Sequence, residues 1–137
     1  MAADPVILRK AQIIERCILR IREEMVGASS IESISQTKQD SVLLNLERAC
    51  QACIDLAMRI VRIKRLGIPT ESREAFSLVK QAGLLTDSLY KEMVAMVGFR
   101  NTAVHDYQGL NLKIIDGIVR DHLEHFLEFA SVGIKLQ

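Results

Sequence analysis

Apolar residues recur every three or four positions through most of this chain, which is the spacing of one face of an α-helix. No segment shows the alternation of apolar and polar residues, bordered by turn dipeptides, that is typical of a strand. The sequence therefore predicts an all-α protein, an up-and-down bundle of four long helices plus one short helix. Its 137 residues predict a single domain, 1–137, with a core that needs neither disulfide nor metal.

Capping residues predict where the first two helices begin and end. Asp4, followed by proline, can accept hydrogen bonds from the free N–H groups of a first turn, and Gly27 can end that helix. The second helix is expected to begin at about Thr37, with Asp40 completing a capping box, and to extend to Leu66.

The remaining helices follow from the same signals. Residues 70–83 predict the short helix, and Thr86 caps a fourth helix that runs through Tyr107. One last, uninterrupted helix is predicted from an apolar stripe that includes one histidine: Leu112, Ile115, Val119, His122, Phe126 and Phe129.

The charge balance limits the kinds of partner. Eighteen Lys and Arg residues face 17 Asp and Glu residues, which excludes a polybasic nucleic-acid coat, so we predict no DNA binding and expect any RNA site to be local. The N-terminal sequence has no basic leader before an apolar run, and no apolar stretch reaches the roughly 18 residues of a membrane span. We therefore expect no membrane contact and a cytoplasmic location.

Cysteine and histidine give no pattern of a metal site. Cys17, Cys50 and Cys53 are too few for a zinc site without a matching pair of ligands, so we expect them to be free thiols in the core. His122 and His125, in "DHLEHF", lack the H-E-x-x-H arrangement and are expected to be satisfied core or interface histidines. No metal and no cofactor is predicted.

The segment "GFRNTAVHDY", residues 98–107, places polar groups on an apolar helix face. With roughly 100° per residue, Arg100 falls in the middle of the stripe formed by Leu89, Met93, Met96, Val97 and Val104. Asn101 and His105, four residues apart, flank the same stripe. An unpaired buried guanidinium costs several kcal/mol. Arg100 must therefore pair with a carboxylate inside the bundle, stabilise a subunit interface, or line a polar cleft that accepts an anion.

The residue types indicate what such a cleft would do. Arginine offers a rigid fork of donors to phosphate, and histidine titrates near neutral pH. His105 could take the proton of a ribose 2′-hydroxyl or return one to the leaving 5′-oxygen, while Arg100 stabilises the charge that grows on phosphorus oxygens. Asn101 could fix the histidine tautomer. Cleavage needs both an acid and a base, and each chain offers one motif histidine. A dimer with two copies of the motif facing one groove would supply the second histidine.

At these residues the chain resembles a known family. "RNTAVHDY" has the R-x4-H pattern of the HEPN superfamily of small helical ribonucleases, and Tyr107 completes the R-x4-H-x-Y form of HepT-like toxins. Further stretches are also similar to HepT-like toxins: "QDSVLLNLERACQACIDLAMRIV" at 39–61, "LGIP" at 66–69 and "MVGFRN" at 96–101.

The resemblance implies the toxin of a type VII toxin–antitoxin pair. Such a toxin is a metal-independent endoribonuclease that acts on RNA as a homodimer. It is neutralised by MNT, a minimal nucleotidyltransferase that transfers AMP to the motif tyrosine. Carried over by position, Arg100 and His105 are the catalytic pair, Asn101 is the supporting polar residue, and Tyr107 is the modified hydroxyl. An added phosphate there would bring negative charge beside Arg100.

Two further features leave alternatives open. Arg59, Arg62, Lys64 and Arg65 concentrate positive charge at the end of the second helix, either as a solvated face or as an RNA backbone track. For function, the alternatives to a nuclease are a non-catalytic nucleotide- or substrate-binding subunit of a nucleotidyltransferase complex, and a purely architectural dimer.

Overall fold

The computed structural model describes residues 3–105 and 111–136, with the side chains of residues 103–105 left out of the description. Within these residues it contains six α-helices and one short 3-10 turn, and no strand, which confirms the all-α prediction. The elements are α1 (Pro5–Glu24), η1 (Ile31–Ser33), α2 (Gln36–Ile63), α3 (Ser72–Gln81), α4 (Asp87–His105), α5 (Leu112–Asp121) and α6 (Leu123–Lys135).

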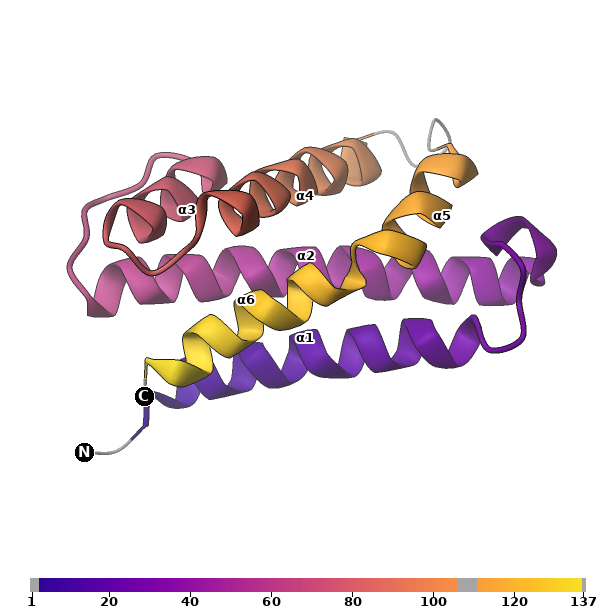
Figure 1. The fold of residues 1–137 in the computed structure, drawn as a ribbon, viewed down its shortest axis with the longest axis horizontal. Helices are drawn as coiled ribbons and strands as arrows, with labels where there is room; N and C mark the ends of the chain where they lie inside the picture. The colour runs from indigo at the N-terminus through magenta and orange to yellow at the C-terminus, as the bar shows by residue number, and fades with distance from the viewer. Residues whose placement is uncertain (1–2, 106–110, 137) are drawn as a thin grey trace.

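The long helix α2 is the centre of the bundle. It packs against α1 along their length, and it also contacts α3, α4 and α6. Figure 1 shows α1 and α2 as an antiparallel pair, with α3 and α4 lying along α2 on the side away from α1. Because α2 has neighbours on several sides, twelve of its residues are buried. They include Leu46, Leu56 and Ile60, each with no exposed surface.

Several predicted caps are confirmed. The carboxylate of Asp4 accepts hydrogen bonds from the N–H groups of Val6 and Ile7. The hydroxyl of Thr86 accepts one from the N–H of Leu89 at 3.1 Å. Gly27 and Gly83 follow the ends of α1 and α3 with positive φ angles of 74° and 79°, a backbone conformation that glycine adopts without a steric penalty.

The predicted boundaries of α2 are wrong by one to three residues. The helix begins at Gln36, because Ser35 rather than Thr37 is the cap and accepts a hydrogen bond from the N–H of Lys38. Asp40 instead accepts one from the side chain of Gln36. At the other end α2 stops at Ile63, before the expected Leu66. The predicted end of the fourth helix at Tyr107 lies outside the described residues.

The prediction of one uninterrupted last helix is also wrong, since His122 (φ −123°, ψ 0°) separates α5 from α6. The break lets the two segments pack in different directions (Figure 1). Helix α5 is tied to the α1–α2 connection, where the Asp116 carboxylate accepts a hydrogen bond from the N–H of Ile31 at 2.9 Å. Helix α6 packs against α1 and α2. The apolar spacing continues across His122, so the pattern alone could not reveal the break.

The three cysteines are free and buried, as predicted. Burial raises the pKa of the Cys50 thiol to about 12 and that of Cys53 well above its usual value. A buried thiol in its neutral form is neither a good nucleophile nor a metal ligand. These side chains therefore belong to the apolar core between the helices.

Two glycines give a test of how tightly α6 packs. A Cβ at Gly133 would lie 3.0 Å and 3.1 Å from the two Cδ atoms of Leu56, which is fully buried, whereas a Cβ at Gly117 would meet nothing within 4 Å. We expect Gly133→Ala to destabilise the fold by about 1–3 kcal/mol through overpacking. Gly117→Ala, the matched control, should stabilise it by about 0.5–1 kcal/mol through helix propensity. Urea denaturation of both variants measures the difference, and equal effects would contradict tight α2–α6 packing.

Candidate active site

Helix α4 carries the candidate residues, and its apolar stripe is confirmed. Leu89, Met93, Met96 and Val97 are buried against the rest of the bundle. The stripe then meets Arg100, whose side chain is only partly buried. The apolar residues of one helix face thus pack α4 against the bundle. The polar motif begins at Arg100, in the last turns of the same helix.

The guanidinium of Arg100 lies close to the second helix. Burial and the Glu47 carboxylate raise the pKa of the Cys50 thiol. The positive charge of Arg100 lowers this pKa, but by less. The hydrogen-bond partner of Arg100 is the neighbouring Asn101, with Nη1 3.5 Å from Oδ1. Among the side chains that the structure describes, no carboxylate lies within 4.0 Å of this guanidinium.

These contacts bear on the three alternatives for Arg100. An internal ion pair would give the guanidinium a carboxylate partner, and the described side chains supply none. Among the described side chains, the contacts therefore favour a subunit interface or an anion-binding cleft. Both leave the donors of Arg100 available to a group from outside the subunit.

The other motif residues are placed to different degrees. Asn101 is exposed, and its amide oxygen faces Arg100. His105 is the last residue of α4, one helical turn after Asn101, while its side chain is outside the description. Tyr107 lies outside the described residues altogether. The backbone thus puts Arg100, Asn101 and His105 together in the final turns of one helix.

The basic residues at the end of α2 are not brought next to Arg100. Helix α4 runs antiparallel to α2, so the end of α2 lies near the start of α4, at the opposite end of the bundle from His105 (Figure 1). Arg62, Lys64 and Arg65 are exposed there. Within one subunit these cations form a separate surface from the motif.

Arg59 differs from the other three cations because it is already engaged. Its Nη2 lies 2.8 Å from Oδ2 of Asp4, and its Nε donates to the same carboxylate. The hydrogen bonds from Arg59 hold the pKa of the Asp4 carboxyl below its usual value, and the N–H groups of Ile7 and Val6 add to this effect. The same carboxylate therefore caps α1 and joins it to α2.

One further cation near α4 was missed by the sequence analysis. Arg73, at the start of α3, is exposed and reaches over α4, where its Nη2 lies 3.6 Å from the position that a Cβ would occupy at Gly98. Gly98 lacks a side chain and so leaves room for the guanidinium. The signal in the sequence was the glycine inside an otherwise apolar helical segment, two residues before Arg100.

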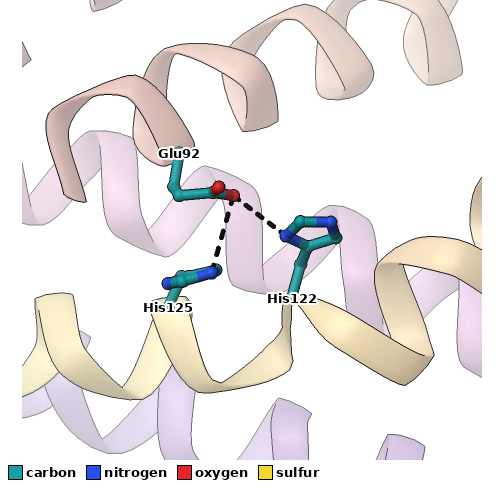
Figure 2. Close-up of side chains that lie close together, drawn as sticks. All are labelled: Glu92, His122 and His125. Atoms are coloured by element: carbon teal, nitrogen blue, oxygen red, sulfur yellow. Dashed lines mark ion pairs between the residues drawn. The ribbon is translucent and has the colours of Figure 1, made fainter. Parts of the chain in front are cut away.

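A group of potential metal ligands also lies between α4 and the start of α6, although no metal site was predicted. In the described parts of the chain, Glu92, His122 and His125 each offer one ligand atom, and these atoms all lie within 4.8 Å of one another. Figure 2 shows the Glu92 carboxylate reaching from α4 toward both imidazoles. Sequence motifs do not reveal this group, because Glu92 is far from the two histidines in the sequence.

Comparisons with known proteins give the chain its family. The family model described as "Ribonuclease HepT-like" matches residues 7–132. A curated relative from Shewanella oneidensis, strain MR-1, named "mRNA nuclease HepT", is 48% identical over 129 residues, which cover 94% of this chain and 96% of the relative. None of the described helices has the length and apolar character needed to cross a membrane.

Solved structures agree with this match. A tri-AMPylated Shewanella oneidensis HEPN toxin in complex with MNT antitoxin is 46% identical, with a TM-score of 0.88 over 98% of this chain and 99% of that one. A mutant toxin–antitoxin complex, MntA–HpeT, gives a TM-score of 0.86 at 46% identity over 96% and 99% of the two chains. With the family model spanning nearly its whole length, the chain belongs to the HepT-like ribonuclease family.

Proposed function

We propose that this protein is the toxin of a type VII toxin–antitoxin pair and an endoribonuclease that cleaves mRNA without a metal ion in the reaction. The observation that carries the proposal is Arg100, a partly buried guanidinium on an apolar helix face that has no carboxylate partner among the described side chains. Membership of a ribonuclease family and the likeness to an mRNA nuclease support the same function.

The proposed reaction uses the two charged motif residues in different roles. His105 moves protons between the ribose 2′-hydroxyl, the leaving 5′-oxygen and solvent, since an imidazole exchanges protons near neutral pH. Arg100 donates its paired N–H groups to the phosphate oxygens as negative charge grows on them. Asn101, which lies against the Arg100 guanidinium, orients that fork, and in this role it is a positioning residue.

A homodimer completes the site in this proposal. Cleavage needs one group that accepts a proton and one that donates a proton, and each chain contributes one motif histidine. Two α4 ends that face each other across a two-fold axis would place two copies of His105 and Arg100 in one groove. The exposed side of Asn101 and the partly exposed Arg100 are then the surfaces that line it.

Regulation follows from the position of Tyr107, two residues after His105. We propose that an MNT-type nucleotidyltransferase is the antitoxin partner and adds AMP to the Tyr107 hydroxyl. The relative that was solved in complex with an MNT antitoxin is tri-AMPylated. Added phosphates would occupy the place of the RNA phosphate beside Arg100 and repel the substrate backbone. We also propose a cytoplasmic location, because that is where a nuclease of this kind would meet mRNA.

The first prediction concerns cleavage itself. With purified protein and an mRNA substrate in EDTA, we expect His105→Ala to slow cleavage by about 10²–10⁴-fold through loss of acid–base catalysis. Arg100→Ala should slow it by about 10²–10³-fold through loss of charge stabilisation, and Arg100→Lys should not restore it because lysine lacks the planar fork.

Arg48→Ala is the matched control for the loss of one arginine. Arg48 is exposed on α2, and its charge acts on Cys17, which lies on α1. This variant should cleave at the rate of the unmodified protein. Cleavage that EDTA abolishes, or that persists unchanged in both His105→Ala and Arg100→Ala, would contradict the proposed mechanism. RNA binding without cleavage by the unmodified protein would favour the binding-subunit alternative.

The second prediction concerns modification. When the toxin is incubated with its nucleotidyltransferase partner and ATP, mass spectrometry should find one or more AMP units on Tyr107, and cleavage should fall as the modified fraction rises. Tyr107→Phe should remain an active nuclease that the partner no longer neutralises by modification. Tyr90→Phe, which alters the other tyrosine of the chain, is the control and should still be modified. AMP on Tyr90 alone would refute this assignment.

The third prediction concerns the exposed cations after α2. If Arg62, Lys64 and Arg65 contact the RNA backbone, each change to glutamine should weaken binding of single-stranded RNA. Each should also lower the magnitude of the salt dependence, the slope of log K against log salt, by about 0.7. Arg20→Gln on α1 removes one exposed cation elsewhere and should leave the slope unchanged. If all four variants keep the slope of the unmodified protein, the cations after α2 form a solvated face.

A further inference from the structure

We propose that Glu92, His122 and His125 form a binding site for one divalent transition-metal ion of the Zn²⁺ type, which joins α4 to the α5–α6 junction. Glu92 lies on α4, His122 is the residue between α5 and α6, and His125 lies in the first turn of α6. This site is independent of the proposed nuclease reaction, which uses the other end of α4.

The ligand atoms are already close to the positions that a metal ion requires. Oε2 of Glu92 lies 3.0 Å from Nδ1 of His122 and 3.7 Å from Nε2 of His125 (Figure 2). In a tetrahedral zinc site with bonds of roughly 2.1 Å, neighbouring ligand atoms are about 3.4 Å apart. The ligand nitrogens of the two imidazoles lie within 4.8 Å of each other, so side-chain rotations bring the three atoms around one ion.

The donor set selects the kind of ion. Two imidazoles and one carboxylate suit Zn²⁺, Co²⁺, Ni²⁺ and Cu²⁺, whereas Mg²⁺ and Ca²⁺ prefer oxygen ligands. The histidines are three residues apart at the start of α6, and this spacing puts both rings on one side of the helix, with their centroids 5.5 Å apart. Three protein ligands leave a fourth position for water, as in sites that are not purely structural.

The hydrogen bonding around the imidazoles supports a metal rather than a simple ion pair. Nδ1 of His122 and Nδ1 of His125 are both buried; the first lies 3.0 Å from Glu92 but makes no hydrogen bond with it, and the second has no hydrogen-bond partner. A protonated His122 would satisfy Glu92 by itself, but it would leave His125 facing the same carboxylate oxygen at 3.7 Å, beyond hydrogen-bond length. One cation between the three groups would be bound by the Glu92 carboxylate, by Nδ1 of His122 and by Nε2 of His125 at once, and Nδ1 of His125 faces Glu128 instead.

Glu128 adds the outer partner that metal-bound histidines usually have. Its Oε1 lies 3.7 Å from Nδ1 of His125, on the opposite side of the ring from the Glu92 carboxylate. If the Glu128 side chain moves within hydrogen-bond distance of Nδ1, it holds the ring with Nε2 toward the metal and raises the basicity of the ligand. Glu128 is thus a positioning residue in the proposed site.

An ion can reach the site. The side chains of Glu92, His122 and His125 are 29%, 43% and 25% exposed. Glu92 and His122 also line a cavity of about 450 Å³ between α4 and α5, together with Phe99, Thr102 and Ile118. Water from this cavity can take the fourth coordination position.

The test uses the full-length chain without a histidine tag and with His105→Ala. The chain has three histidines, so this variant retains only His122 and His125 as imidazole ligands, and its expression does not depend on an active nuclease. We expect one ion per chain in two titrations. Binding of Co²⁺ is measured by its visible absorption, and binding of Zn²⁺ by calorimetry. The Tm should rise with Zn²⁺ concentration.

Matched variants separate the site from other ligands. Glu92→Gln and His125→Ala should abolish the Co²⁺ absorption and the Tm shift, while Glu128→Gln should weaken affinity by about 10–100-fold. Glu124→Gln removes a carboxylate that pairs with Arg22 and should bind the metal as before. Circular dichroism of each variant without metal shows whether it is folded, and the comparison uses the folded ones. The proposal is overturned if the parent binds no Co²⁺ or Zn²⁺, or if folded Glu92→Gln and His125→Ala bind them as the parent does.

Discussion

The burial of α2 is the constraint on which the rest of the structure depends. This helix contacts α1, α3, α4 and α6, so residues around most of its circumference must be apolar or small, and twelve of them are buried. The neighbouring helices each need only one apolar face. Helix α4 uses its apolar face, through Val97, to pack on the bundle, and Arg100, further along this face, is only partly buried. The position of the candidate site is thus set by where helix packing stops.

Apolar periodicity predicted the helices except for the break at His122. Capping residues predicted most of the helix ends, because each cap is a local interaction between residues a few positions apart. The caps at Asp4 and Thr86 are examples. What periodicity could not show were contacts between distant segments. The break at His122 keeps the apolar spacing intact, and the hydrogen bond from the N–H of Ile31 to Asp116, which ties α5 to the α1–α2 connection, joins segments far apart in the sequence. The pairing of Arg59 with Asp4 is of the same kind, and it sets Arg59 apart from the cations that follow it.

The motif residues illustrate the same division. That Arg100 lies on the buried side of α4 follows from residue spacing, but whether a carboxylate meets it depends on the three-dimensional arrangement of other helices. The structure gives Asn101 as its partner. The metal-ligand group was hidden for the same reason: its two histidines lie at the start of α6, while the carboxylate comes from α4. Glu92 and Arg100 are eight residues apart, which turns them about 80° from each other around α4. One helix thereby presents two chemically different faces, one to α2 and one to the α5–α6 junction.

The ends of the bundle have a practical consequence for anyone who wishes to attach something to this toxin. The first turn of α1 and the last turn of α6 lie side by side at the end where α2 finishes, and α4 reaches its own end on the far side of the molecule (Figure 1). A fluorescent protein or an affinity handle joined to either end of the bundle would lie near the end of α2 and away from the end of α4 in the same subunit (Figure 1). Within one subunit, such a label would therefore leave the end of α4 uncovered.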